Sequence, residues 1–219
     1  MGGAVTVDDA AFAEHAVRGR FNAAFFRVMD GYINWHLRDH KAGVFADLPE
    51  EVVEVGSGTG ANLRYLKPGG RLIAVEPNPY MHPTLRRAAA RRGVALEIRD
   101  VMGERIDLPD ASADAVISSL VLCTVSNPAQ VLAEIRRVLR PGGRYCFVEH
   151  VAAPVGTMTR RVQRAVRRPW AWVFEGCSCE RDLAAVLDAA GFTEMQSKAY
   201  RIHSPFVPFN TQIAGYAVA

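Results

Sequence analysis

The sequence contains little lysine and little cysteine, and each shortage excludes a class of protein. Only three of its 26 basic residues are lysine, and its formal net charge is +3. We interpret the preference for arginine as a trace of genome composition, because so small and diffuse a charge gives no support for a nucleic-acid partner. Four cysteines in 219 residues do not make a disulfide framework, so we expect free thiols in a reducing compartment.

Long hydrophobic runs are missing as well. The N-terminal residues hold no apolar core of signal-peptide length, and no later run approaches the roughly 18 residues that a membrane-spanning helix needs. We therefore expect a cytoplasmic protein. There is no internal repeat or low-complexity linker, and 49% of the residues are hydrophobic, which is enough for one sizeable core. The chain is predicted to be a single domain over 1–219, as a monomer or homodimer.

Apolar residues near the N-terminus recur at helical spacing, in two adjacent stripes that form one broad face. We expect this helix, part of an N-terminal helical cap over 1–48, to dock on the core. A helix resting on a membrane as a peripheral contact is the alternative. The stripes consist of Val17, Phe21, Phe25, Val28, Tyr32 and Trp35, and of Phe26, Met29, Ile33 and Leu37.

From residue 51 onward, short apolar runs alternate with segments of helical periodicity. The runs "EVVEVG", "RLIAVE", "VALEI", "ADAVISSLVL" and "GGRYCFVEHV" are predicted strands. The alternation indicates an α/β fold with a mostly parallel sheet, and the final run "TQIAGYAVA" is expected to pair antiparallel with "FTEMQSKAY". Residues 154–176 break the alternation. We expect them to form an insertion, a lid over the carboxyl edge of the sheet, where ligands of such folds bind.

The segment "VVEVGSGTGAN" follows a predicted strand and opens a helix. Its glycines at positions 56, 58 and 60 permit a tight turn and close approach of the backbone to a ligand. A dinucleotide fingerprint would need glycine at position 61, where this chain has alanine. Glu54 would repel a pyrophosphate but favour a cation. A cationic nucleoside therefore fits this segment better than a nicotinamide cofactor does.

Glu76 lies at the tip of the next strand, where a carboxylate can accept hydrogen bonds from both hydroxyls of a ribose. The glycine loop, this acidic residue and the later "LRPGGR" segment together resemble the class I S-adenosylmethionine-dependent methyltransferases. The resemblance implies a Rossmann-like, seven-stranded, mostly parallel sheet with helices on both faces, and S-adenosyl-L-methionine as cofactor. It implies a cofactor site made of Glu54, Gly56, Ser57, Gly58, Gly60, Asn62, Glu76, Pro77, Met102, Gly103, Ser119 and Leu120.

One position departs from the pattern of that superfamily. Many relatives have an acidic residue near position 102, which accepts a hydrogen bond from the amino group of the adenine. This chain has Met102 there. Asp100, Glu104 or a backbone carbonyl could take its place, and the sequence leaves these alternatives open.

Several stretches match one family more narrowly. "EVGSGTGAN", "LVLCTV", "EIRRVLRPGGRYCFVEHVAA", "FEGCSCERD" and the terminal "GYAVA" resemble the methyltransferase-like family that methylates alkyl thiols. The resemblance implies methyl transfer to a small-molecule acceptor, a thiol. The alternatives are an O-, N- or C-methyltransferase of a specialised metabolite, a phospholipid-directed methyltransferase, and a binding module that keeps the cofactor without turnover.

The fifth predicted strand ends in Glu149 and His150, beside the expected position of the transferred methyl group, and both are catalytic candidates. His150 is the better general base, because its unperturbed pKa is near neutrality. A histidine that only shapes the pocket is the alternative. We expect the acceptor to be surrounded by Cys123, Trp170, Phe174 and Cys177. The arginines at 160, 161, 164, 167 and 168 are expected to form a solvated helix face, with binding of an anion as the alternative.

Two cysteines stand one residue apart in "FEGCSCERD". Zinc sites commonly use a C-x₂₋₄-C pair and four ligands in all, so this spacing leads us to expect no metal. An arsenite methyltransferase is a further alternative, which we do not expect; it would require Cys123 to lie near Cys177. We predict that Cys177 lines the pocket. Cys179 is predicted to cap the next helix, with Asp182 as the third helical residue reaching back.

Overall fold

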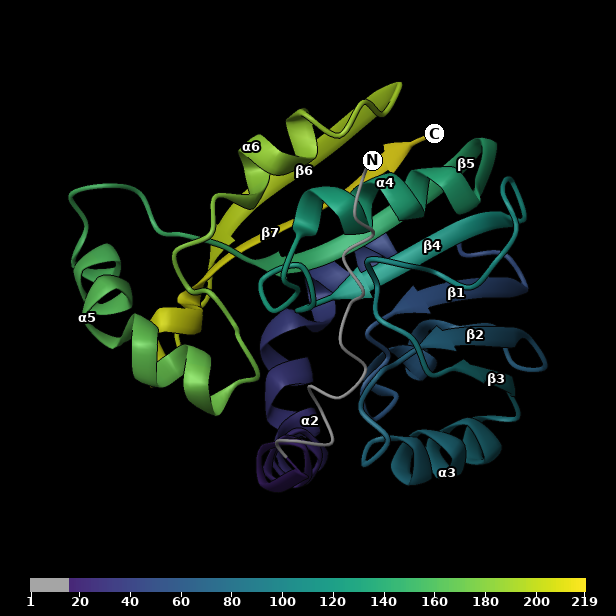
Figure 1. Ribbon diagram of the computed structural model, residues 1–219, viewed down its shortest axis with the longest axis horizontal. Helices are drawn as coiled ribbons and strands as arrows, with labels where there is room; N and C mark the ends of the chain where they lie inside the picture. The colour runs from purple at the N-terminus through teal and green to yellow at the C-terminus, as the bar shows by residue number, and fades with distance from the viewer. Residues whose placement is uncertain (1–15) are drawn as a thin grey trace, which may run out of the picture.

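The structure, a computed structural model, describes residues 16–219, so the start of the predicted N-terminal cap lies outside the described residues. Its centre is a seven-stranded sheet of order β3-β2-β1-β4-β5-β7-β6 (Figure 1). β7 runs antiparallel to both neighbours and the other pairs are parallel, which confirms the predicted sheet. The strands are β1 Glu51–Val55, β2 Arg71–Val75, β3 Ala95–Arg99, β4 Ala113–Ser119, β5 Leu139–His150, β6 Glu194–Arg201 and β7 Thr211–Val218.

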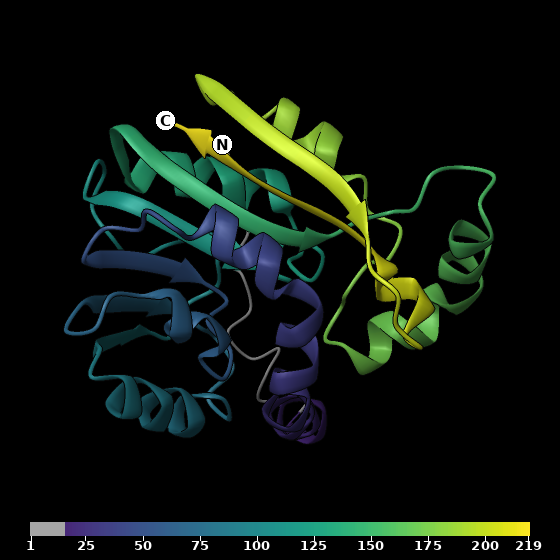
Figure 2. The same ribbon diagram turned by 180° about the vertical axis from the view of Figure 1, so that it is seen from behind.

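Helices cover both faces of the sheet, as the two opposite views show (Figures 1 and 2). α4 and α6 pack on one face, and α2, the 3-10 helix η1 and α3 pack on the other. The helix that the sequence predicted after the glycine loop is present, as the short 3-10 helix η1. The helices are α2 Ala16–Val44, η1 Ala61–Tyr65, α3 His82–Arg92, α4 Pro128–Val138, α5 Met158–Val173, α6 Leu183–Asp188 and the 3-10 helix η2 Val207–Asn210.

The inner strands are buried on both faces, because successive side chains alternate between two cores. Val53 and Val55 of β1 join the core under α4 and α6, whereas Val52 and Leu72 join the core under α2 and α3. This double burial explains the nearly continuous apolar runs in the sequence. The carboxyl ends of β1, β2, β4 and β5 meet at one edge, so the loops that follow these strands surround a common space.

The two apolar stripes of α2 lie in different environments. Leu37 is fully buried and Ile33 is packed against the core under α2 and α3. On the other stripe, Val17 is 83% exposed, Val28 74% and Trp35 61%. The prediction that the whole face docks is therefore wrong for these three residues, whereas Phe25 and Tyr32 of the same stripe are partly buried at the cavity. The N-terminal half of α2 borders the cavity described below on one side only and leaves its other side to solvent.

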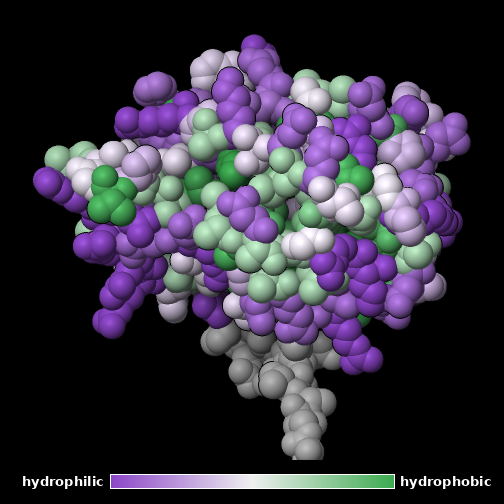
Figure 3. All heavy atoms as spheres, turned by 90° about the horizontal axis from the view of Figure 1, so that it is seen from above, coloured by the Kyte–Doolittle hydropathy of each residue, from purple (hydrophilic) through white to green (hydrophobic). Residues whose placement is uncertain are grey.

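Other large apolar side chains are exposed around α5, namely Val155, Met158 and Trp172. Viewed from above, hydrophobic and hydrophilic residues are interspersed on the surface (Figure 3). Within residues 16–219, no helix combines the length and the apolarity that crossing a bilayer requires.

The segment 154–176 forms α5 and its flanking turns, which lie beyond the ends of β5 and β7 and beside η2 (Figure 1). Thr157 caps α5, because its side chain accepts the N–H of Arg160 at 3.2 Å. The buried Gln163 ties α5 to the rest of the protein: its Oε1 accepts from the N–H of Ala153 at 2.8 Å and its Nε2 donates to the carbonyl of Pro208 at 3.0 Å. Of the five arginines named above, all except Arg160 are exposed.

The cap of α6 differs from the prediction. Asp182 is itself the N-cap, and its side chain accepts the N–H of Ala185 at 3.3 Å. Cys179, the predicted cap, lies upstream of the helix, is fully buried, and points its Sγ at the carbonyl of Gln163 at 3.3 Å. A carboxylate is the stronger hydrogen-bond acceptor, and it stands directly before the first helical residue, so it caps the helix in place of the thiol.

Candidate active site

A cavity of about 710 Å³ lies at the carboxyl edge of the sheet. It is bordered by α2, by the loops that follow β1, β2, β3 and β4, by the end of β5, by the last turn of α5 with the residues that follow it, and by η2. Its lining divides into two parts. Backbone and carboxylate groups surround one part, called the loop half below, and sulfur, imidazole and aromatic groups surround the other, called the sulfur half.

The glycine loop forms the floor of the loop half. Gly56 and Gly58 have φ angles of +67° and +54°, a region that side-chain-bearing residues rarely adopt. A Cβ at Gly56 would lie 2.3 Å from the side chain of Val121, so glycine is also required there for space. The loop is held to the next strand by the N–H of Gly56, which donates to the carbonyl of Val75 at 2.8 Å.

Glu76 is the buried carboxylate that organises this loop. Its Oε2 accepts the N–H of Gly58 at 2.7 Å and its Oε1 accepts the N–H of Asn78 at 2.8 Å. Burial raises the pKa of Glu76 to about 7, although both hydrogen bonds favour the carboxylate. Each oxygen has a second lone pair, so the ionised group can accept two further hydrogen bonds from a ligand.

A buried polar chain runs behind the loop. Lys41 Nζ donates to Asn62 Oδ1 at 2.8 Å, and Asn62 Nδ2 donates to Glu54 Oε1 at 2.7 Å. Burial lowers the pKa of Lys41 to about 8 and raises that of Glu54. Our sequence reasoning missed Lys41. The signal was its rarity, since it is one of only three lysines and falls near the end of a long amphipathic segment.

Glu104 holds the loop after β4 in place. Its Oε1 accepts the N–H groups of Ser126 at 2.9 Å and of Asn127 at 3.1 Å. Its Oε2 is buried and has no hydrogen-bond partner among the described residues, and the same holds for the hydroxyl of Ser119. Both side chains border the cavity. Two buried polar atoms are therefore available to a ligand at this end.

Glu149 is buried behind the cavity and does not border it. Its Oε2 accepts the N–H groups of Val121 at 2.9 Å and Leu122 at 3.0 Å, and its Oε1 accepts the hydroxyl of Ser118 at 2.6 Å. These bonds hold the turn after β4, where Leu120 has a φ of +63°. The prediction that Glu149 is catalytic is therefore corrected: its carboxylate is used to shape the backbone and has no access to a substrate.

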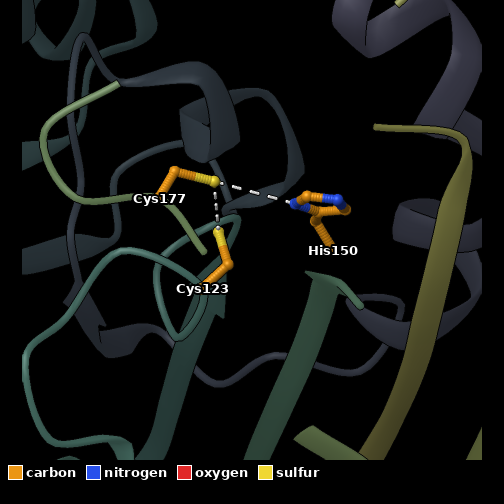
Figure 4. A group of neighbouring side chains, drawn as sticks. All are labelled: Cys123, His150 and Cys177. Atoms are coloured by element: carbon orange, nitrogen blue, oxygen red, sulfur yellow. Dashed lines mark hydrogen bonds between the residues drawn. The ribbon is translucent and has the colours of Figure 1, made fainter. Parts of the chain in front are cut away.

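Three side chains from distant parts of the chain meet in the sulfur half (Figure 4). Cys123 follows β4, His150 ends β5, and Cys177 follows α5, and all three are buried. The Sγ atoms of Cys123 and Cys177 are 3.5 Å apart, and Cys177 Sγ is 3.7 Å from His150 Nδ1. The proximity of Cys123 to Cys177, which an arsenite methyltransferase would require, is therefore present. The N–H of Ser178 donates to the carbonyl of Cys123 at 2.7 Å and joins the two loops.

The orientation of His150 is fixed by the backbone. Its Nε2 lies 2.7 Å from the carbonyl oxygen of Pro208. Because a carbonyl can only accept, Nε2 carries a proton, and in the neutral ring Nδ1 offers a lone pair to the sulfur half. The sequence predicted a proton acceptor at this position, and the structure identifies Nδ1 as the atom that faces the cavity side.

The two thiols of this group differ. A hydrogen bond with Cys123 lowers the pKa of Cys177 well below the usual value of a thiol, although burial raises it. His150 and the indole N–H of Trp170 also lower this pKa, and the indole donates to Cys177 Sγ at 3.3 Å. The same thiol pair and burial raise the pKa of Cys123. Cys177 is thus the sulfur that most readily carries negative charge.

Aromatic rings enclose the rest of the sulfur half. Phe174 contacts Trp170, with ring centroids 4.6 Å apart, and Phe25 of α2, with centroids 5.3 Å apart. Phe206 and Phe209, from the segment around η2, also border the cavity. The ring contacts join residues after α5 to α2, so the two segments close this end together.

Comparison with known proteins identifies the family. Residues 53–147 match the methyltransferase domain family. Human thiol S-methyltransferase TMT1B is 36% identical over 170 residues, which cover 76% of this chain and 70% of that protein. Human thiol S-methyltransferase TMT1A is 33% identical over 196 residues, which cover 84% of this chain and 80% of that protein. The chain belongs to this methyltransferase family.

The fold of the methyltransferase agrees with solved relatives. An S-adenosylmethionine-dependent methyltransferase from Aquifex aeolicus has a TM-score of 0.63 at 17% identity, over 90% of this chain and 97% of that chain. The resemblance seen in the sequence, its Rossmann-like fold and its cofactor S-adenosylmethionine are thereby confirmed. The chain is an S-adenosylmethionine-dependent methyltransferase.

The loop half of the methyltransferase fits this cofactor. Glu76 has lone pairs for two ribose hydroxyls, and the buried, partnerless oxygens of Glu104 and Ser119 suit amino or ammonium donors. Of the two acidic alternatives for the adenine contact, Glu104 borders the cavity, whereas Asp100 is exposed and lies outside its lining.

Most of the predicted site residues meet at this one cavity. Glu54 and Gly60 do not border it: Glu54 stands behind Asn62, and Gly60 packs against Leu63 and Leu85. The predicted cofactor residues on its surface are Gly56, Ser57, Gly58, Asn62, Glu76, Pro77, Met102, Gly103, Ser119 and Leu120. Also on its surface are the predicted catalytic residue His150 and the predicted acceptor residues Cys123, Trp170, Phe174 and Cys177.

The prediction of no metal did not consider the group of side chains that the structure brings together. It rested on the pair Cys177 and Cys179, but Cys179 turns away toward α5. Within residues 16–219, Cys123, His150 and Cys177 place one nitrogen and two sulfur atoms within 4.8 Å of one another, all buried, which is a group of suitable donors for a metal ion.

Proposed function

We propose that this methyltransferase methylates the sulfur of a small, apolar thiol. The proposal rests on the sulfur half of the cavity, where aromatic rings surround the lone pair of His150 Nδ1 and the thiols of Cys123 and Cys177. Such a surface suits an uncharged acceptor with one weakly acidic proton. The two human relatives named as thiol S-methyltransferases support the same acceptor.

For the cofactor, we assign the roles by chemistry. Glu76 accepts hydrogen bonds from the ribose hydroxyls, and Glu104 Oε2 accepts from the adenine amino group, next to Pro77, Met102 and Gly103. Gly56, Ser57 and Gly58 surround the methionine portion, whose ammonium group meets Ser119 and the backbone of Leu120. Asn62, held by Glu54 and Lys41, keeps the loop in shape. The bound cofactor supplies an activated methyl group on a sulfonium.

The protein's own task is to align the acceptor and take its proton. Alignment of two reactants can remove about 7 to 11 kcal/mol from a barrier, whereas a general base contributes about 10²- to 10⁴-fold in rate. We assign the base to His150 Nδ1, with Cys177 beside it. The proton of the acceptor thiol passes to this pair, while the sulfur's electron pair forms the new bond to carbon and S-adenosylhomocysteine leaves.

Two segments serve as movable walls in this proposal. The lid over 154–176 and the cap over 1–48, of which residues 16–48 are described, meet through the ring contact between Phe174 and Phe25. Closing this contact excludes water from the sulfur half, and water exclusion strengthens the electrostatic interactions inside it.

The acceptor is tested with compounds matched in size. Release of S-adenosylhomocysteine is measured with an alkyl thiol, the corresponding alcohol, a phenol and an amine. We expect turnover of the thiol alone. Faster turnover of the phenol or the amine would contradict the proposal and select one of the other acceptor atoms.

One observation favours a second candidate, an enzyme that acts at a lipid surface. Val17, Val28 and Trp35 form an exposed apolar stripe on α2, as expected for a helix that lies on a membrane. Co-sedimentation with anionic vesicles, compared with a Val28→Ser variant, tests this candidate. Equal sedimentation of the two proteins, or none, eliminates it.

A further inference from the structure

We infer that Cys123, His150 and Cys177 bind a zinc ion, with an open coordination position that faces the sulfur half of the cavity. The binding site rests on geometry alone. Its use in catalysis rests on the proposed thiol methylation. Nothing in the short spacing of Cys177 and Cys179 predicted such a site, because the ligands come from two loops and the end of β5, which are far apart in the sequence.

The distances fit a tetrahedral ion. Zinc binds sulfur at about 2.3 Å and imidazole nitrogen at about 2.0 Å, so the edges between ligands are about 3.5 to 3.8 Å. The Cys123 and Cys177 sulfurs are 3.5 Å apart, and Cys177 Sγ is 3.7 Å from His150 Nδ1. The third edge, between Cys123 Sγ and Nδ1, stays within 4.8 Å. To bind an ion among the three atoms, the side chains of Cys123 and His150 approach each other until this edge is also about 3.5 Å.

The hydrogen bonds that His150 and Cys177 make to neighbouring residues also fit a zinc site. Metal-binding histidines usually donate their other ring N–H to a carbonyl or carboxylate, which fixes the ring and its tautomer. His150 makes this contact to Pro208, whose carbonyl also accepts from Gln163. The indole N–H of Trp170 donates to Cys177 Sγ, as expected beside a thiolate.

The donor set selects the metal. Two thiols and one imidazole are soft or borderline ligands, which disfavour magnesium and calcium and suit zinc. Structural zinc sites have four protein ligands, whereas catalytic sites have three and keep one position open. Here the described residues supply three, and all three border the cavity. The site therefore belongs to the open kind.

An open zinc position gives the acceptor a direct role. The substrate thiol binds there and loses its proton to solvent, because a thiol coordinated to zinc is deprotonated. Its sulfur then forms the bond to the methyl carbon as the bond between that carbon and the cofactor's sulfur breaks, with the electron pair staying on S-adenosylhomocysteine. The thioether product is a weaker ligand and dissociates. Zinc keeps its charge throughout and takes over the task assigned to Nδ1.

Cobalt(II) is the probe for the site. The whole protein is freed of metal with a chelator and titrated with Co²⁺, followed by Zn²⁺. We expect about one ion per chain, with thiolate-to-cobalt charge-transfer absorption and the visible bands of a four-coordinate ion, all removed by Zn²⁺. Cys123→Ser, Cys177→Ser and His150→Ala should each weaken binding more than the roughly 10- to 100-fold cost of losing an outer contact.

Cys179→Ser is the matched control, because Cys179 is equally buried and only two positions from Cys177 but faces Gln163. It should keep the spectrum. Loss of the spectrum in Cys179→Ser as well, or cobalt bands without thiolate absorption, overturns the site. If a cysteine variant does not fold, His150→Ala and the melting temperature of the wild-type protein with and without Zn²⁺ decide; a temperature unchanged by Zn²⁺ also overturns the site.

Turnover of the same thiol by metal-free and zinc-loaded protein separates the two proposals. We expect zinc to raise kcat at least tenfold. Equal turnover without metal overturns the catalytic use of zinc and leaves thiol methylation standing. A cobalt spectrum with no turnover of any thiol overturns thiol methylation and leaves the metal site standing.

Discussion

The two halves of the cavity are built in opposite ways. In the loop half, backbone N–H groups of two neighbouring strand ends converge on Glu76, and most contacts join residues fewer than 20 positions apart. In the sulfur half, Cys123 and Cys177 are 54 positions apart and meet only after three loops are folded. The loop half is thus set by local geometry, and the sulfur half depends on the packing of α2 and α5.

The largest effect is expected in the loop half, from Glu76→Ala. The change removes the two hydrogen bonds that we propose Glu76 makes to the ribose, and it leaves the N–H groups of Gly58 and Asn78 without their acceptor. Hydrogen bonds to charged groups contribute about 1.5 to 3 kcal/mol each, so the affinity for S-adenosylhomocysteine should fall more than about 100-fold by calorimetry. Glu76→Gln, which keeps one acceptor oxygen, should fall in between. A loss below tenfold in Glu76→Ala would remove Glu76 from the cofactor site.

The counterpart in the sulfur half is His150→Ala. We expect kcat at pH 7 to fall about 100-fold. The variant loses the base that we propose for the acceptor thiol, and it also loses a ligand of the inferred zinc ion. The affinity for S-adenosylhomocysteine should change less than about twofold. A rate loss under tenfold with unchanged cofactor affinity would show that His150 only shapes the pocket.

The sequence predicted the loop half of the cavity better than the sulfur half. The sequence predicted the sheet, the glycine loop and Glu76, because strand ends and glycine turns follow from neighbouring residues. It did not predict the contact of Cys123 with Cys177, the role of Lys41, or the exposed stripe of α2, since each depends on which distant segment packs alongside. It also misassigned Glu149. Position at the end of a strand does not tell which way a side chain points, and this one points at the turn after β4.

A pH effect should separate the halves further. Burial raises the pKa of Glu76 to about 7. Above that pH the carboxylate accepts both ribose hydroxyls, and below it the protonated group accepts more weakly. Affinity for S-adenosylhomocysteine should therefore fall by up to about tenfold per pH unit as the pH drops below 7. Glu76→Gln should show no such dependence; an equal slope in that variant would assign the titration to another group.

The smallest effect compares two tryptophans in the last turn of α5. Trp170 is partly buried and donates to Cys177, whereas Trp172 is 67% exposed. Trp170→Ala should raise the KM for the thiol about tenfold, and Trp172→Ala no more than about twofold, with the KM for the cofactor unchanged in both. Equal effects from the two variants would mean that the hydrogen bond from Trp170 to Cys177 does not contribute to binding of the thiol.

The loop between Cys177 and α6 is anchored at its far side. The N–H of Ser178 donates to Cys123, and Arg181 Nη1 donates to the carbonyls of Leu122 at 2.6 Å and Val125 at 2.7 Å. These bonds hold the loop against the turn after β4, while Trp170 and Phe174 hold Cys177 from the side of α5. The exposed arginine face of α5 is therefore the part that can be redesigned. As long as Trp170 and Gln163 are kept, Cys177 stays in register with the strand ends.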